Sequence, residues 1–594
     1  MSGLDVAGLS TVLDTPEGSL RAVDGVDFAI EPGECFALVG ESGCGKSMTA
    51  LSLLRLLPEV ARIAAGEVRL DGQDLLALPE AAMRAVRGKR VAMIFQEPST
   101  ALNPVLTVGR QVLEVIERHS ALRGGAARAR AMALLEAVGI PEAARRYDEY
   151  PFQLSGGLRQ RAMIAAALAV DPEVLVADEP TTALDVTIQA QILELLKQLQ
   201  AKRGMALLLI THDLGIVARM ATRVAVMYAG EIVEVAGREA FLRAPQHPYS
   251  QKLFEALPGR GGELAVIRGQ VPALTARFPG CRFVERCEQA FERCRVEVPL
   301  LKDGVRCHLR DDGPAPARIA PPAAPAREAA LEAAVLLEAT DLQVHFPIRR
   351  GLFRRTVGHV KAVDGVSLAI RAGRTLALVG ESGSGKTTVG KALLQLVRPT
   401  GGSVRHLGEE LTRLPRGALK RHRARMQIVF QDPYASLNPR MRVADILAEG
   451  MRSLGVGEGE ADRTRRIDAL LGQVGLPAHA KARYPHEFSG GQRQRIAIAR
   501  ALAVEPQLIV CDEPTSALDV SVQAQILNLL AELQARLGLA YLFITHNLAV
   551  VEHLAHEVAV MRAGRIVEHG TAAQVLGQPR HAYTRELLAA VPKL

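Results

Sequence analysis

One glycine-rich loop occurs twice in this chain, and the same motifs follow each copy in the same order. An order and spacing that hold over five motifs indicate a duplicated domain. At 594 residues, the chain is also longer than a single hydrophobic core usually supports. We therefore expect two domains of one fold. The equivalent residues lie 334 to 340 positions apart and are Lys46 and Lys386, Gln96 and Gln431, Ser155 and Ser489, Asp178 and Asp512, and His212 and His546.

The spacing of the repeat sets the expected domain boundaries. The first domain is predicted over residues 5–260 and the second over residues 336–594. Between them, residues 261–310 form an extension that carries four of the seven cysteines. Residues 311–335 are rich in Ala and Pro, which predicts an extended linker because proline fixes φ and removes backbone donors.

Each copy has the pattern of an α/β domain. Continuous apolar runs such as 35–39, 174–177 and 207–210 are typical of buried parallel strands. Helices are expected over 46–57 and 189–203, and a helical region spans roughly 100–170. The sequence therefore predicts a parallel-sheet core with an inserted helical subdomain.

Both glycine-rich loops have the G-x-x-x-x-G-K-[ST] pattern, which presents backbone N–H groups to phosphate oxygens at a helix N-terminus. The lysines would neutralise β- and γ-phosphate charge, and the following hydroxyls of Ser47 and Thr387 would ligate Mg²⁺. Two nucleotide sites are therefore predicted. Their loop residues are Gly40, Glu41, Ser42, Gly43, Cys44, Gly45, Lys46, Ser47 and Met48 in the first copy, and Gly380, Glu381, Ser382, Gly383, Ser384, Gly385, Lys386, Thr387 and Thr388 in the second.

Two later apolar runs end in paired acids, Asp178-Glu179 and Asp512-Glu513. An aspartate at a strand end can hold Mg²⁺, and the adjacent glutamate can polarise the water that attacks a phosphate. The next apolar run of each copy ends at a histidine, which can clamp the γ-phosphate. We therefore predict Glu179, His212, Glu513 and His546 as catalytic residues and Asp178 and Asp512 as Mg²⁺ ligands.

A serine and two glycines open a further helix in each copy, as Ser155-Gly156-Gly157 and Ser489-Gly490-Gly491. With these motifs the chain resembles ATP-binding cassette (ABC) proteins over most of its length. The resemblance implies two tandem ABC-type P-loop ATPase domains that bind ATP and Mg²⁺. It also implies that Gln96 and Gln431 are Q-loop residues, which join the catalytic and Mg²⁺-binding sets.

In that family, two cassettes pack head to tail around two ATP molecules. The resemblance then implies that the Lys46 loop pairs with Ser489 and the Lys386 loop with Ser155. It further implies that 183–185 and 517–519 are the D-loops.

Two stretches in each copy narrow the resemblance to the dipeptide/oligopeptide importer branch. These are the residues around each Q-loop glutamine and the motifs His247-Pro248-Tyr249-Ser250 and His581-Ala582-Tyr583-Thr584. The resemblance implies a subunit that hydrolyses ATP to drive peptide import. The expected partners are two integral-membrane permeases and, through them, an extracytoplasmic substrate-binding protein. The expected location is the cytoplasmic face of the inner membrane, as a peripheral protein.

Cys281, Cys287, Cys294 and Cys307 suggest a metal site, because the first residues do not have the pattern expected of a secretory signal and thiols outside oxidising compartments often bind metals. A helix over 288–293 would place Cys287 and Cys294 on one face. The segment resembles a Cys-rich extension of peptide-importer ATPases that binds a 4Fe–4S cluster. Zinc and unligated thiols are the alternatives, although the C-x-x-C pairs of structural zinc sites are missing.

The alternative function is a soluble twin-cassette ATPase that acts on ribosomes or nucleic acid. The net charge of +8 is compatible with it. However, the aromatic residues near the basic stretches do not follow the interleaved pattern of a base-stacking surface, so nucleic acid is not expected as a partner. No apolar run approaches the ~20 residues that span a bilayer.

Overall fold

The computed structural model describes residues 3–15, 18–181, 186–257, 264–267, 269, 271–272, 274–275, 278–312, 333–350, 355–516 and 518–590. These residues form two compact units. The first contains the described residues up to 255 and from 267 to 312. The second contains those from 256 to 266 and from 333 to 590. The first D-loop, 183–185, and most of the predicted linker lie outside the described residues.

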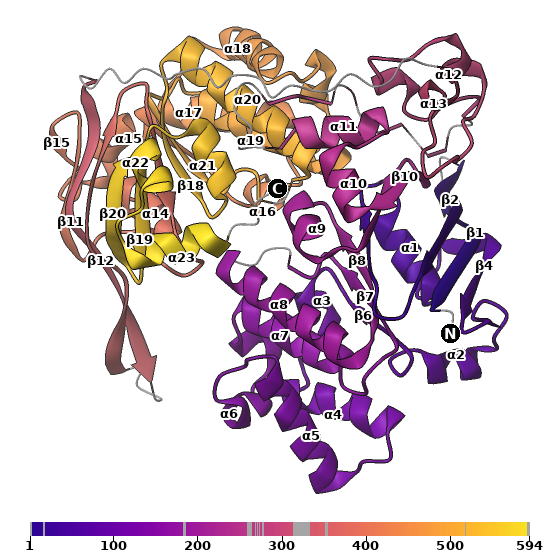
Figure 1. The fold of residues 1–594 in the computed structure, drawn as a ribbon. Coiled ribbons are helices and arrows are strands. Elements are labelled where there is room, and N and C mark those ends of the chain that lie inside the picture. Colours follow the sequence, from indigo (N-terminus) through magenta and orange to yellow (C-terminus); the bar gives the residue numbers. More distant parts are fainter. Residues whose placement is uncertain are drawn as a thin grey trace. The chain divides into compact units, whose positions relative to one another are not determined.

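The first unit has two sheets (Figure 1). A four-stranded antiparallel sheet has the order β2-β1-β4-β5, and a six-stranded sheet has the order β10-β9-β3-β8-β7-β6. In the second sheet all strands run parallel except β10. The strands are β1 (Leu4–Thr15), β2 (Gly18–Ile30), β3 (Cys35–Val39), β4 (Ala61–Leu70), β5 (Gln73–Asp74), β6 (Val91–Ile94), β7 (Val174–Asp178), β8 (Ala206–Thr211), β9 (Arg223–Tyr228) and β10 (Glu231–Gly237).

Helices cover this parallel sheet, and a helical lobe lies between β6 and β7 in the sequence. In Figure 1, α4, α5 and α6 of that lobe lie well away from the antiparallel sheet. The lobe confirms the inserted helical subdomain. The helices up to β10 are α1 (Lys46–Leu53), α2 (Glu80–Val86), α3 (Pro98–Ala101), α4 (Val108–His119), α5 (Gly124–Ala137), α6 (Ala143–Tyr147), η1 (Pro151–Gln153), α7 (Gly156–Ala167), α8 (Val186–Arg203) and α9 (Leu214–Met220).

The chain continues after β10 into the helices that lead to and build the cysteine-bearing extension. In Figure 1, α12 and α13 lie beyond β10 in the first unit. The backbone N–H of Val235 in β10 donates to the carbonyl of Gly304 at 2.7 Å, which ties the extension to this strand. The helices are α10 (Arg238–Arg243), α11 (Pro248–Glu255), η2 (Val284–Arg286), α12 (Glu292–Val296) and α13 (Leu309–Asp312).

The parallel strands are apolar throughout because both faces of their sheet are covered. In β8, Leu208 and Ile210 join a core that includes the antiparallel sheet and α1. The intervening Leu207 and Leu209 join a second core with the helical lobe and α8. Alternate side chains of one strand therefore enter two different cores, which explains the continuous apolar runs in the sequence.

The second unit repeats this architecture with sheet orders β12-β11-β14-β15 and β16-β17-β18-β13-β19-β20. Ala256 and Leu264 lie in its core, and the Asn528 amide donates to the Leu264 carbonyl at 2.7 Å. The strands are β11 (Val335–Arg350), β12 (Arg355–Arg371), β13 (Thr375–Val379), β14 (Gly401–His406), β15 (Glu409–Glu410), β16 (Met426–Val429), β17 (Leu508–Asp512), β18 (Ala540–Thr545), β19 (Glu557–Arg562) and β20 (Arg565–Thr571).

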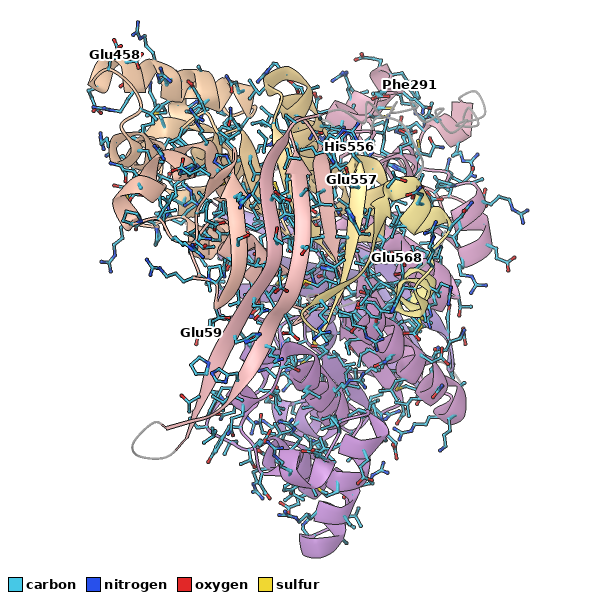
Figure 2. The ribbon with its side chains drawn as sticks, turned by 90° about the vertical axis from the view of Figure 1, so that its left-hand side faces the viewer. Glu59, Phe291, Glu458, His556, Glu557 and Glu568 are labelled. Atoms are coloured by element: carbon cyan, nitrogen blue, oxygen red, sulfur yellow. The ribbon has the colours of Figure 1, made fainter. Side chains whose placement is uncertain are left out.

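Figure 2 shows that β11 and β12 extend as a narrow arm past the rest of their sheet. Phe346 pairs with Val360 along this arm, and both are about half exposed. The helices of the second unit are α14 (Lys386–Leu393), α15 (Arg416–Arg425), α16 (Pro433–Ser436), α17 (Val443–Leu454), α18 (Glu460–Gln473), η3 (Ala478–Ala482), η4 (Pro485–Glu487), α19 (Gly490–Leu502), α20 (Val520–Leu537), α21 (Leu548–Leu554), α22 (Ala572–Gly577) and α23 (Ala582–Ala590).

Two predicted helix boundaries differ from the structure. The helix expected over 46–57 ends at Leu53, and Arg55 adopts a positive φ of 52° that a helix cannot continue through. The helix expected over 189–203 begins earlier, at Val186. The condition that would place Cys287 and Cys294 on one helix face, a helix over 288–293, is not met, because α12 begins only at Glu292 and contains just one of the cysteines, Cys294. Among the described residues, no helix has both the length and the apolar composition to cross a membrane.

Candidate active sites

One glycine in each phosphate loop lets neighbouring backbone approach closely. A Cβ at Gly45 would lie 2.2 Å from the Ala22 carbonyl oxygen, and one at Gly385 would lie 2.1 Å from that of Ala362. Both glycines also have positive φ, 111° and 104°, and each is the N-cap of the helix that follows. No other residue type fits this position without moving the backbone, because any side chain would clash.

The phosphate-loop lysines fold back onto their own loops. Lys46 Nζ donates to the carbonyl oxygens of Gly40 and Glu41 at 2.8 and 2.9 Å. Lys386 Nζ makes the same bonds to Gly380 and Glu381, at 2.7 and 2.8 Å. Both lysines are nearly buried, so each loop carries a positive charge at the N-terminus of a helix, where phosphate oxygens would bind.

The predicted Mg²⁺ ligands of both copies lie together. Thr387 Oγ1 donates to Asp512 Oδ1 at 2.9 Å. In the first copy Asp178 is also buried, and its Oδ1 has no hydrogen-bond partner among the described residues. Burial raises the pKa of Asp178 to about 6, although the Ser47 hydroxyl opposes the rise. Burial likewise raises the pKa of Asp512. A hydroxyl beside a buried carboxylate in each copy is a pair of oxygen ligands that fits a hard ion such as Mg²⁺.

A glutamine, a glutamate and a histidine are joined in the first copy. Gln96 Nε2 donates to Glu179 Oε2 at 3.0 Å, and His212 Nδ1 lies 3.0 Å from Glu179 Oε1. Glu179 also adopts a positive φ of 47°, a conformation uncommon for a residue with a side chain. The three residues that the sequence predicted separately therefore form one hydrogen-bonded set around the glutamate.

The second copy repeats this arrangement. Gln431 Nε2 donates to Glu513 Oε2 at 3.0 Å, and His546 Nδ1 lies 3.1 Å from Glu513 Oε1. Glu513 has the same φ of 47°. Burial raises the pKa of Glu513, but the hydrogen bond and charge of His546, aided by Lys386, outweigh burial and leave it lowered. A glutamate that stays ionised can accept a proton from water.

The topology explains why these residues meet. The phosphate loop follows β3, and Asp178 ends β7. Gln96 follows β6 and His212 follows β8. The four strands are parallel neighbours, so their carboxyl ends lie on one edge of the sheet. Ligand sites of open parallel sheets form at this edge.

Ser155 and Ser489 cap helices at the end of each helical lobe. Ser155 Oγ accepts from the Leu158 N–H at 3.4 Å, and Ser489 Oγ accepts from the Gln492 N–H at 3.4 Å. Gln492 also accepts from the Ser489 N–H at 3.1 Å and completes a capping box. The equivalent residue of the first copy, Leu158, has no side-chain amide and cannot complete a capping box with Ser155. Gly156, Gly157, Gly490 and Gly491 form the first turns of these helices.

One structural residue of each site was missed from the sequence. The Glu41 N–H donates to Tyr249 Oη at 2.9 Å, and the Glu381 N–H donates to Tyr583 Oη at 3.1 Å. Both tyrosines are buried. They belong to the motifs 247–250 and 581–584, which the sequence offered only as family markers. Their contact with the phosphate loop spans about 200 residues of chain, so no local pattern reveals it.

The predicted metal site in the extension receives no support. Burial raises the pKa of Cys281 to about 12 and that of Cys287 to about 11, and nearby Cys294 and Cys307 add to both shifts. The four thiols are therefore neighbours. However, nowhere in the described part of the chain do three or more Cys, His, Asp or Glu side chains form a group that could hold a metal ion.

Each unit thus has the fold and the strand-end residues of a P-loop nucleotide hydrolase. A family profile described as ABC transporter matches residues 23–182 and 363–516. A second, described as Oligopeptide/dipeptide transporter, C-terminal region, matches residues 233–294 and 567–594. The chain belongs to the ABC transporter family and hydrolyses ATP as one of its ATPases.

Similar proteins match along the whole chain. It is 47% identical over 604 residues to the Oligopeptide transport ATP-binding protein OppD of Mycobacterium tuberculosis, covering 99% of this chain and 98% of that protein. It is 46% identical to the Peptidoglycan transport ATP-binding protein YejF of Agrobacterium fabrum, covering 99% and 96%. It is also 46% identical to the Glutathione import ATP-binding protein GsiA of Salmonella typhimurium, covering 99% and 89%.

Proposed function

We propose that this chain hydrolyses ATP to drive the import of peptides or related small solutes through an ABC transporter. The observation that carries the proposal is similarity over the full length to ATP-binding proteins of oligopeptide, peptidoglycan and glutathione transport. The repeated match to an oligopeptide/dipeptide transporter region supports the same substrate class. The alternative, an ATPase acting on ribosomes or nucleic acid, has no supporting observation.

The proposed chemistry follows from the hydrogen-bonded sets. Lys46 and Lys386 would hold the β- and γ-phosphates, and Ser47, Asp178 and Gln96 would hold Mg²⁺ in the first site. Thr387, Asp512 and Gln431 would do so in the second. Mg²⁺ would neutralise phosphate charge. Glu179 and Glu513 would each orient a water and accept its proton, while His212 and His546 would fix the glutamate and contact the γ-phosphate.

We further propose that each ATP is shared between the two cassettes. The Lys46 loop would work with Ser489, and the Lys386 loop with Ser155. The N-termini of α7 and α19 are suited to this role because each presents free N–H groups and a dipole that favours phosphate. ATP would then close the cassettes, and hydrolysis would open them.

The proposed partners are two integral-membrane permeases, with an extracytoplasmic binding protein that delivers the substrate to them. The chain would lie on the cytoplasmic face of the inner membrane. Purification of the tagged chain from detergent-solubilised membranes tests this. Two integral-membrane proteins should copurify, and the substrate-loaded binding protein should stimulate ATP hydrolysis after reconstitution. Stable association with ribosomes, with no membrane protein bound, would overturn the proposal.

We also propose an iron–sulfur cluster on Cys281, Cys287, Cys294 and Cys307. The support is the donor set, since Cys294 and Cys307 lie close enough to Cys281 and Cys287 to help raise the pKa of these two thiols. Their side chains do not form a ligand group as they stand. Anaerobic purification with measurement of iron, sulfide and zinc tests it. Equal amounts of iron and sulfide are expected. Zinc without sulfide would show a zinc site instead, and a protein without either metal would contradict both.

A further inference from the structure

Every polar group of Glu41, the second residue of the first phosphate loop, makes a hydrogen bond. Its N–H donates to Tyr249 Oη, and its carbonyl oxygen accepts from Lys46 Nζ at 2.9 Å. Its carboxylate accepts two hydrogen bonds from Arg286, at 2.7 Å from Nη1 to Oε2 and 3.1 Å from Nη2 to Oε1. A bidentate pair of this kind fixes both partners in direction as well as distance.

Arg286 reaches this loop from the cysteine-bearing extension, 245 residues further along the chain. Its side chain is only 5% exposed, and that of Glu41 only 7%. Arg286 Nη1 also lies 3.3 Å from Tyr228 Oη. Phe283, which precedes Arg286 by one turn, packs against the rings of Tyr228 and Tyr249 at 5.2 and 5.4 Å between centroids. The extension therefore packs directly behind the phosphate loop.

Other contacts of the extension hold Arg286 in this position. Arg282 pairs with Asp24 and donates to the Ala229 carbonyl. Arg306 Nε donates to the Ile232 carbonyl at 2.9 Å. These bonds attach the extension to β10, to the turn before it and to Asp24. The backbone that carries Arg286 is therefore fixed relative to the phosphate loop.

The charge of Glu41 makes this contact matter for ATP. A carboxylate buried beside a site for a polyphosphate would repel the ligand and would itself be costly without a partner. Arg286 neutralises it. The positive charge of Lys46 is then left to act on the phosphates rather than on the loop's own acid.

The second phosphate loop lacks this arrangement. The Glu381 N–H donates to Tyr583 Oη, and the Glu381 carbonyl oxygen accepts from Lys386. The Glu381 carboxylate, however, is more exposed, and within the described residues no cation forms an ion pair with it. Arg562 lies over the Tyr583 ring at 4.7 Å instead. Solvent therefore screens Glu381, whereas Glu41 depends on Arg286.

We infer that Arg286 is a positioning residue of the first ATP site, which acts through Glu41 and makes phosphate binding there depend on the cysteine-bearing extension. The inference rests on the proposed binding of ATP at the loop 40–47. It predicts an asymmetry between the two sites, because the second loop has no such contact in the described part of the chain.

The test measures the affinity of the full chain for MgATP and for MgADP by calorimetry. A Lys386→Ala background reports the first site. Adding Arg286→Met should weaken ATP binding about tenfold and ADP binding less, because ATP carries one more negative charge against the unpaired carboxylate. Adding Glu41→Gln to that variant removes the carboxylate and should recover most of the lost affinity. In a Lys46→Ala background, Arg286→Met should leave the second site unchanged.

Arg293→Met is the matched control, since it removes another arginine of the same extension, one that pairs with Glu297 four residues further on. It should keep the ATP affinity of its parent. Unchanged ATP affinity in the Arg286→Met variant would overturn the inference. So would an equal loss for ATP and ADP that Glu41→Gln does not recover, because that result indicates only lost structure. If the Lys386→Ala parent itself binds no ATP, the assignment of the first site fails instead.

Discussion

His212 Nδ1 lies 3.0 Å from Glu179 Oε1, and His546 Nδ1 lies 3.1 Å from Glu513 Oε1. In both copies the other oxygen of the glutamate accepts from a glutamine amide at 3.0 Å. The carboxylate that would activate water is thus held at both oxygens. This duplicate geometry is the basis for predicting that both sites can hydrolyse ATP.

Removal of the histidine should impair hydrolysis more than binding. His212→Ala frees one oxygen of Glu179 and removes a γ-phosphate contact, so ATP turnover should fall about tenfold to a hundredfold with a smaller change in KM. His546→Ala should behave alike at the second site. Steady-state turnover measures both effects. The control is His479→Ala, at an exposed histidine. Turnover equal to that of the control in both variants would contradict the assigned role.

The tyrosine hydroxyls behind the phosphate loops should contribute to ATP affinity. Tyr249→Phe leaves the N–H of Glu41 without its partner, which costs about 1–3 kcal/mol for a buried group. ATP affinity at the first site should fall about threefold to tenfold, because the phosphate loop loses the hydrogen bond that holds its backbone at Glu41. Tyr583→Phe should do the same at the second. Tyr541→Phe is the control, since it removes a buried hydroxyl that donates to the Leu530 carbonyl, away from the loop. Affinities that match this control would show that the hydroxyls do not support the loops.

A buried histidine pair should make the second unit sensitive to acid. His406 Nδ1 lies 2.9 Å from His422 Nδ1. Burial, with contributions from His422 and Arg425, lowers the pKa of His406 to about 4, from 6.5 in an unfolded chain. The folded state therefore favours neutral His406. This stabilisation is complete above pH 6.5 and is lost as the pH falls towards 4.

The free energy of unfolding should accordingly drop by up to about 3 kcal/mol across that pH window. Urea unfolding at a series of pH values measures it. His406→Leu should flatten the dependence, whereas His486→Leu, at an exposed histidine, should not. The same pH slope in the parent and in His406→Leu would rule out the buried pair as its cause.

The sequence was sufficient to predict the residues at the strand ends. Apolar runs mark buried parallel strands, and the residues that follow them necessarily lie on one edge of the sheet, as Asp178 and His212 do. The predicted α/β fold and the helical lobe follow from the same periodicities. The ABC motifs then assigned a role to each residue.

Contacts between distant segments could not be predicted in this way. Arg286 meets Glu41 across 245 residues, and Tyr249 meets it across 208. Neither contact leaves a local pattern, because it depends on how the extension packs on the folded cassette. The helix over 288–293 that would have aligned Cys287 and Cys294 does not form, since α12 begins only at Glu292 and residues 288–289 form a turn.

Glu179 and Glu513 are the proposed catalytic bases, each of which accepts a proton from the water that attacks ATP during transport. The direct test is ATP hydrolysis and peptide uptake by the reconstituted transporter carrying Glu179→Gln, Glu513→Gln or both, with the exposed Glu59→Gln as control. The account predicts that the double variant still binds ATP but hydrolyses it at least about a hundredfold more slowly and imports no peptide. Hydrolysis and uptake at the control rate in the double variant would contradict it.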